Sequence, residues 1–136
     1  MIIVQQDHFA EIVKYSLDQY PSEACGLLGG RIEGELRIVE KIYGLTNVDK
    51  SPDHFSMDPK EQFSAIKDMR QSGLVMLGNY HSHSASPARP SDEDKRLAFD
   101  PDASYLMLSL LDRKNPVLKS FNIKKELVWE EEIKFG

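Results

Sequence analysis

The sequence contains few of the residues on which several common classes of protein depend. It has a single cysteine, Cys25, so neither an internal disulfide nor a cysteine-rich zinc cluster can form. It also lacks a stripe of lysine and arginine, and its net charge is -5, which argues against nucleic acid as a partner. Histidine and carboxylate side chains are therefore the ligands that remain for a metal ion.

Long hydrophobic runs are missing as well. No apolar stretch approaches the ~20 residues that a membrane-spanning helix needs. The opening MIIVQQDHFAEIV has neither the basic start nor the long apolar centre of a signal peptide. We therefore expect a cytoplasmic protein without a membrane partner, and the length predicts one domain that spans residues 1–136.

Apolar residues with a 3.6-residue period, together with capping residues, predict three helices. Asp7 is the expected N-cap of the first and Pro21 ends it. Asp58 caps the second, and Ser91 begins a short third. The predicted helices span residues 7–20, 58–71 and 91–99.

Strand-forming segments account for most of the remaining chain. Two of them, separated by Glu33-Gly34, read as a hairpin, and LVMLGNYHSH reads as a buried central strand. The predicted strands span residues 24–32, 35–45, 74–83, 104–111, 118–124 and 126–135. This mixture of helices and strands predicts an α/β (α+β) fold.

Two of the four histidines, His81 and His83, stand at the end of the central strand. Side chains two apart on a strand point to the same face, with Cα atoms ~6.5 Å apart. One metal ion can bridge such a pair. Zinc in catalytic sites takes three protein ligands and keeps one position open. Asp94, beyond a proline-rich loop, is the leading candidate for the third ligand.

The same residues also fit a simpler interpretation. An H-x-H pair is by itself a weak signal. Ser91-Asp92-Glu93-Asp94 fits an N-cap followed by acids in the first helical turn, which the helix dipole favours without any metal. Residue types and spacing alone therefore leave open both a metal site and a well-capped helix.

The whole string of His81, His83, Ser91 and Asp94 resembles the signature of the JAMM/MPN+ metallopeptidases, the family that includes zinc deubiquitinases. The resemblance continues upstream. FSMDPKEQFSAIKDMRQSGLVMLGNYHSH looks like the family's helix leading into its central strand, and PSEACGLLGG looks like the segment that carries its catalytic glutamate. In all, the resemblance covers roughly residues 8–111.

This resemblance implies roles for five side chains. His81, His83 and Asp94 match ligands for one Zn²⁺ per chain. Glu23 matches the general base, although a glutamate just before a strand is ordinarily solvated. Ser91 matches the residue that stabilises the oxyanion. The implied fold is that of a JAMM/MPN domain, cytidine deaminase-like in architecture, with a mixed, mostly antiparallel sheet flanked by helices.

The function implied by the resemblance is zinc-dependent hydrolysis of an amide bond. The chain is similar in length to compact prokaryotic members, which act on ubiquitin-like or sulfur-carrier proteins that end in Gly-Gly. Two other functions stay open, a non-catalytic MPN-type protein-interaction domain and a metalloamidase for a small molecule. The sequence predicts neither the oligomeric state nor the identity of the carrier.

Four other residues near these motifs raise separate questions. Cys25 lies in an apolar strand pattern, so we expect a buried side chain and not a nucleophile. Ser84 stands where many family members have proline, which leaves the conformation of the following loop open. His54 and Phe55, in a polar loop, are candidates for the border of a substrate channel.

Overall fold

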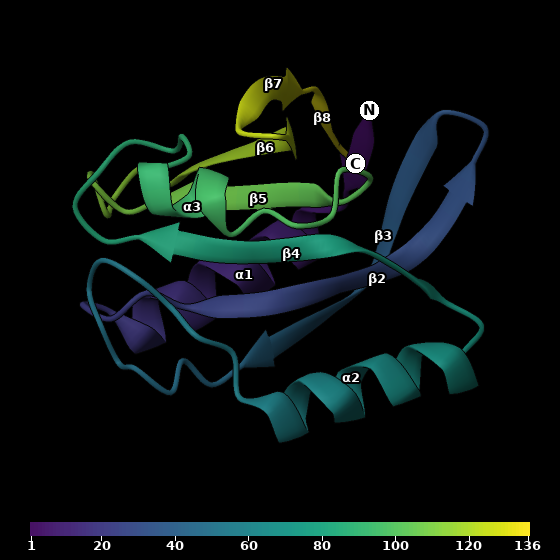
Figure 1. The fold of residues 1–136 in the computed structure, drawn as a ribbon, viewed down its shortest axis with the longest axis horizontal. Helices are drawn as coiled ribbons and strands as arrows, with labels where there is room; N and C mark the ends of the chain where they lie inside the picture. Colours follow the sequence, from purple (N-terminus) through teal and green to yellow (C-terminus); the bar gives the residue numbers. More distant parts are fainter.

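The computed structural model describes residues 1–136 as one eight-stranded sheet with three helices (Figure 1). The helices are α1 (Gln6–Gln19), α2 (Pro59–Gln71) and α3 (Asp92–Arg96). The strands are β1 (Ile2–Val4), β2 (Cys25–Glu33), β3 (Leu36–Leu45), β4 (Val75–His83), β5 (Ser104–Ser109), β6 (Val117–Lys124), β7 (Leu127–Glu131) and β8 (Ile133–Phe135). None of the helices combines the length and the apolar character needed to cross a membrane.

The order of strands across the sheet is β7-β6-β5-β4-β2-β3-β1-β8. β1 runs parallel to both β3 and β8, and β4 runs parallel to β5. The other neighbouring pairs are antiparallel. The prediction of a mixed, mostly antiparallel sheet with flanking helices is therefore confirmed.

The sheet curls until its two edges almost meet. β7 and β8 lie at opposite ends of the strand order, yet only Glu132 separates them in the chain. Beside this junction the buried carboxylate of Glu131 accepts hydrogen bonds from the Ser104 and Ser120 hydroxyls, each 2.7 Å long. These bonds satisfy polar groups that burial would otherwise leave without partners, so they support the closed shape.

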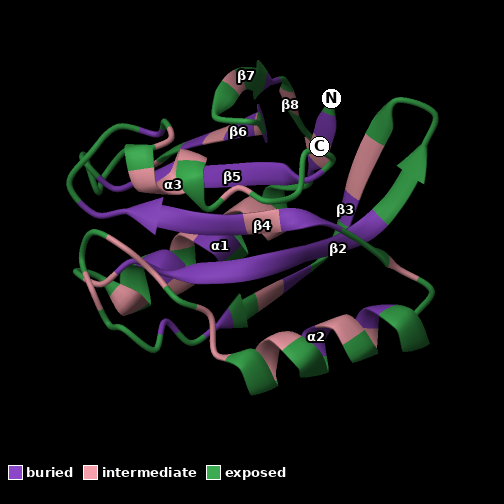
Figure 2. Cartoon of the chain, viewed as in Figure 1, coloured by how far each residue is buried: buried purple, intermediate pink, exposed green.

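The two longer helices cover opposite faces of the sheet. α1 places Ile12 in a core cluster with Leu28 and Tyr80. α2 places Met69 in a second cluster with Leu27. Because Leu27 and Leu28 are neighbours on β2, their side chains point to opposite faces. β4 runs through the middle of this arrangement and is buried along most of its length (Figure 2).

On the face covered by α2, the half of the sheet built from β5 and β6 carries a third apolar cluster. Its buried members are Ala103, Tyr105, Met107, Phe121 and Ile123. In register, His81 of β4 pairs with Cys25 of β2 on one side and with Met107 of β5 on the other. Directly opposed residues share a face, so His81 projects between the α2 cluster and the third cluster.

The structure differs from the sequence prediction at several boundaries, and β5 for example ends at Ser109 and not at Leu111. α1 begins at Gln6 with Gln5 at the N-cap and no side-chain cap, while Asp7 lies inside the first turn. α3 ends at Arg96, short of Phe99, because Leu97 forms its C-cap and residues 98–103 form the irregular connection to β5. The predicted strand 126–135 is two strands, since it leaves one sheet edge and joins the other. β1 was not predicted, because three residues carry too little pattern.

Candidate metal centre

His81 and His83 end β4, and their rings meet on one face of the sheet. Their Nε2 atoms are 3.0 Å apart, and both side chains are buried. The Oδ2 atom of Asp94, from the first turn of α3, lies 3.3 Å from His81 Nε2 and 3.2 Å from His83 Nε2. The structure therefore brings all three sequence-predicted ligands to one point.

The capping of α3 holds Asp94 in this position. The Ser91 hydroxyl accepts a 3.0 Å hydrogen bond from the Asp94 amide, and Asp94 Oδ2 accepts a 2.9 Å bond from the Ser91 amide. The two interpretations of this segment are thus compatible, because the same reciprocal cap that starts the helix also aims the carboxylate at the histidines. The Ser91 hydroxyl keeps its own hydrogen free to donate.

The geometry of the three ligand atoms suits a divalent metal ion. Ligands at ~2.0–2.1 Å from a tetrahedral zinc lie about 3.3–3.4 Å from each other, close to the spacing of His81 Nε2, His83 Nε2 and Asp94 Oδ2. His83 Nδ1 lies 2.9 Å from the Pro87 carbonyl, so Nδ1 carries the hydrogen and the Nε2 lone pair faces the cluster. Phe55 stacks on His81 with ring centroids 4.7 Å apart and steadies that ring.

The pKa shifts of Asp94 and His81 favour the forms that bind a metal ion, whereas that of His83 does not. Burial opposes ionisation of Asp94, but hydrogen bonds with His81 and His83 outweigh it and hold the pKa of Asp94 below its usual range. Burial lowers the pKa of His81. For His83, burial also acts to lower the pKa, but the hydrogen bonds with Asp94 and Pro87 raise it overall. The site thus offers an ionised carboxylate beside a neutral His81.

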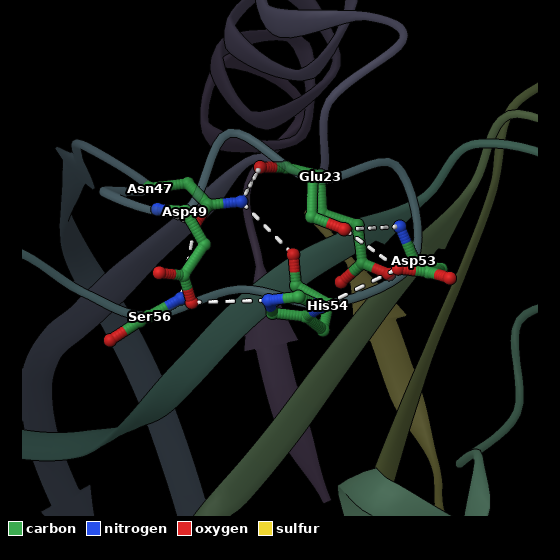
Figure 3. A network of polar contacts seen from close by, with 7 residues as sticks. Glu23, Asn47, Asp49, Asp53, His54 and Ser56 are labelled. Atoms are coloured by element: carbon green, nitrogen blue, oxygen red, sulfur yellow. Dashed lines mark hydrogen bonds and ion pairs between the residues drawn. The ribbon is translucent and has the colours of Figure 1, made fainter.

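Glu23 precedes β2 and is buried, with 5% of its surface exposed. Its amide donates to the Ser51 carbonyl, and its carbonyl accepts from the Asn47 side chain at 3.0 Å. Figure 3 shows this Asn47 amide between Glu23 and the carbonyl of His54. The loop 46–56 therefore fixes the backbone of Glu23, which is why this glutamate is not the solvated residue that its sequence position suggests.

Burial also changes the acidity of Glu23. Desolvation, reinforced by the nearby acids Asp94, Asp53 and Glu93 and opposed by His83, raises the pKa of Glu23 to about 8. A carboxyl group with a pKa near neutrality can both accept and return a proton.

This raised pKa predicts how the metal-free protein responds to pH. A carboxyl whose pKa is higher in the folded state contributes stability below about pH 4.5, and this contribution is lost as pH rises toward 8. We expect Glu23→Gln to remove that loss, so the variant gains on the order of 1–2 kcal/mol over wild type at pH 8, allowing for solvent screening. Urea unfolding of both proteins in chelator at pH 5 and pH 8 measures the difference, and parallel pH dependences would contradict it.

Two cavities flank the ligand cluster. One of about 360 Å³ lies on the Glu23 side, and its lining includes Glu23, His83, Arg89 and Ser91. The other, of about 150 Å³, lies on the His81 side. Its lining residues are Phe55, Asn79, His81, Glu93, Asp94, Leu97, Tyr105 and Met107. A substrate chain can therefore occupy both sides of the ligand cluster at once.

The structure also places the four neighbouring residues that the sequence analysis discussed. Cys25 is buried, and burial raises the pKa of its thiol to about 12, so it is no nucleophile. The Ser84 hydroxyl donates to the Pro21 carbonyl at 2.7 Å and so fixes the start of the loop that follows His83. Phe55 borders the smaller cavity, whereas His54 pairs with Asp49 and Asp53 (Figure 3).

Sequence reasoning missed other residues that the fold brings to the site. Tyr105 and Met107 line the smaller cavity from β5, and their alternate spacing would have indicated a shared face once the register with β4 was known. Arg89 lines the larger cavity but lies in an irregular loop, where no periodic pattern shows which way a side chain points.

Comparison with known proteins agrees with this geometry. Residues 5–124 match the family described as prokaryotic homologs of the JAB domain. The chain belongs to this family. The solution structure of DSY2949 from Desulfitobacterium hafniense is similar, with a TM-score of 0.93 and 57% identity, and covers 100% of this chain and 93% of that one. A JAB1/MPN domain protein from Archaeoglobus fulgidus, at 20% identity and a TM-score of 0.65 over 100% of this chain and 97% of its own, shares the fold.

Curated relatives are named as a peptidase and as a desampylase. A CysO-cysteine peptidase of Mycobacterium tuberculosis is 34% identical over 98% of this chain and 90% of its own. A desampylase of Pyrococcus furiosus is 34% identical over 68% of this chain and 63% of its own. The predicted class, a stand-alone prokaryotic peptidase of JAMM/MPN type, is confirmed by these matches.

Proposed function

We propose that this protein is a zinc-dependent peptidase that hydrolyses the amide bond after the C-terminal Gly-Gly of a ubiquitin-like or sulfur-carrier protein. The observation that carries the proposal is the triangle of His81 Nε2, His83 Nε2 and Asp94 Oδ2, with sides of 3.0–3.3 Å. Glu23 and Ser91 line one cavity with His83. In this proposal one Zn²⁺ per chain binds to His81, His83 and Asp94.

Zinc in such a site polarises a carbonyl group and lowers the pKa of water from 15.7 to about 7. The chain's own residues supply the remaining chemistry. Glu23 takes a proton from the attacking water and gives it to the leaving amine as the C–N bond breaks and the water oxygen joins the carbonyl carbon. Ser91 donates its free hydroxyl hydrogen to the oxyanion, a contact worth about 3 kcal/mol.

The choice of substrate rests on the relatives and on the shape of the site. The names of the relatives point to CysO-cysteine and, for a probable protease of Thermus thermophilus that is 35% identical over 69% of this chain and 61% of its own, to TtuB-protein conjugates. Both names describe cleavage between a named component, CysO or TtuB, and the group attached to it. A Gly-Gly tail has no side chains and therefore fits in extended form between flanking walls such as Phe55 and Ser91.

The proposal is tested with a panel of small carrier proteins that end in Gly-Gly and are extended by one further amino acid. We expect the zinc-loaded protein to release that amino acid and leave a carrier ending in Gly-Gly, which mass spectrometry detects as the loss of one residue. Chelator-treated protein is the control and should release nothing. Uniform inactivity across the panel at full zinc occupancy would favour a binding domain or a small-molecule amidase instead.

A further inference from the structure

The larger cavity contains a cationic side chain that no acid neutralises. Arg89 is exposed, lines this cavity with Glu23 and Ser91, and takes part in none of the ion pairs of the structure. Asp53, another acid of the lining, already accepts from the Ser51 hydroxyl at 2.6 Å and lies 3.4 Å from His54 Nδ1. Arg89 is therefore available to an anion that enters the cavity.

The backbone holds Arg89 at a defined place relative to the metal ligands. The Pro87 carbonyl accepts a 2.9 Å hydrogen bond from the Arg89 amide and another of 2.9 Å from His83 Nδ1. Pro90, which follows Arg89, restricts the backbone further. The Ser86 carbonyl accepts a 2.6 Å bond from the Ser109 hydroxyl of β5. The loop that carries Arg89 is thus anchored both to His83 and to the sheet.

We propose that Arg89 binds the free α-carboxylate of a single amino acid at the end of the substrate. This inference rests on the proposed function and specifies its substrate. Glu23 delivers a proton to the leaving nitrogen, and in a terminal amino acid the carbon next to that nitrogen also bears the carboxylate. Glu23 and Arg89 line the same cavity. The leaving amine can therefore receive its proton from Glu23 while the carboxylate of the same amino acid pairs with the guanidinium of Arg89.

Other leaving groups lack this feature. The ε-amine of a lysine in a protein conjugate has no carboxylate on the neighbouring carbon, and the first residue of a longer peptide has a neutral amide there. Arg89 gains no ionic partner from either. The chain therefore selects release of one terminal amino acid from a carrier over cleavage of an isopeptide bond.

Three matched peptides test this selection. Each ends in Gly-Gly, joined to cysteine with a free carboxylate, to cysteine amide, or to the ε-amine of a lysine amide. We expect the zinc-loaded wild type to cleave the free acid with kcat/KM about 10- to 100-fold above the other two, mostly through KM. Arg89→Gln should lower kcat/KM for the acid alone to the level of the amide. Arg96→Gln, which removes an exposed arginine of α3 outside the cavity, is the control and should leave the preference intact.

Binding provides a second readout that does not depend on turnover. In a Glu23→Gln background, calorimetry should give a Kd for the free-acid peptide about 10- to 100-fold lower than for the amide, and adding Arg89→Gln should equalise the two. Equal binding of acid and amide by the single variant would overturn the role of Arg89. Absence of cleavage of every peptide, with acid-selective binding retained, would instead contradict the proposed hydrolysis and leave the carboxylate site standing.

Discussion

Replacing His83 with alanine is expected to reduce the zinc content from one ion per chain to nearly none. The substitution removes one of the three ligand atoms that meet within 3.3 Å, and it leaves Asp94 facing only His81. Even a partner that merely orients a ligand is worth about 10- to 100-fold in metal affinity, so loss of the ligand itself costs more. Metal analysis by mass spectrometry after gel filtration measures the content, and peptide release should fall with it.

A second histidine provides the matched control for this experiment. His54 lies in the neighbouring loop and pairs with Asp49 and Asp53, outside the ligand triangle. His54→Gln should therefore keep its zinc. Circular dichroism of both variants separates loss of metal from loss of fold. Stoichiometric zinc in a folded His83→Ala protein would show that the ion binds elsewhere.

Glu23→Gln is expected to keep its zinc and to lose about 10²- to 10⁴-fold in kcat, the range that general acid–base catalysis contributes. Glutamine has nearly the same shape, so the buried backbone contacts of Glu23 with Asn47 and Ser51 persist. It cannot, however, take up or return a proton. Single-turnover cleavage of the free-acid peptide by variants of matched zinc content gives the rate.

Glu93 is the appropriate comparison for Glu23. It is also an acid beside the ligands, but it lines the smaller cavity on the His81 side. Glu93→Gln should therefore change kcat by much less than Glu23→Gln. If Glu23→Gln stays active while His81→Ala loses activity, the metal site is correct but the general base is another residue.

Much of this fold was predictable because local sequence and tertiary structure agree. Asp58 accepts from the Lys60 and Glu61 amides and starts α2 as expected. The hairpin of β2 and β3 turns at Gly34, whose φ of +62° favours glycine. These features depend on residues close together in the chain, which periodicity and capping rules describe. β1 and the separation of β7 from β8 depend instead on pairing across the closed sheet.

The features of the candidate site also separate into those that the local sequence predicts and those that depend on the tertiary structure. The sequence by itself determined that His81 and His83 share a strand face and that Ser91 caps a helix whose first turn contains Asp94, because both follow from local strand and helix geometry. Residue spacing alone could not decide whether the cap faces the histidines. The tertiary structure decided this by placing the first turn of α3 beside the end of β4, where Asp94 lies 3.2 Å from His83 and lines one cavity with Tyr105 and Met107 of β5.

The burial of Glu23, which raises its pKa, also depends on the tertiary structure. Its burial depends on the loop 46–56, whose Asn47 side chain binds the carbonyl of His54 within the loop and that of Glu23, 24 residues earlier in the chain. The tertiary structure also placed Arg89 in the same cavity as Glu23. The physical reason is that burial and charge environment are sums over neighbours in space, whereas the sequence specifies only neighbours along the chain.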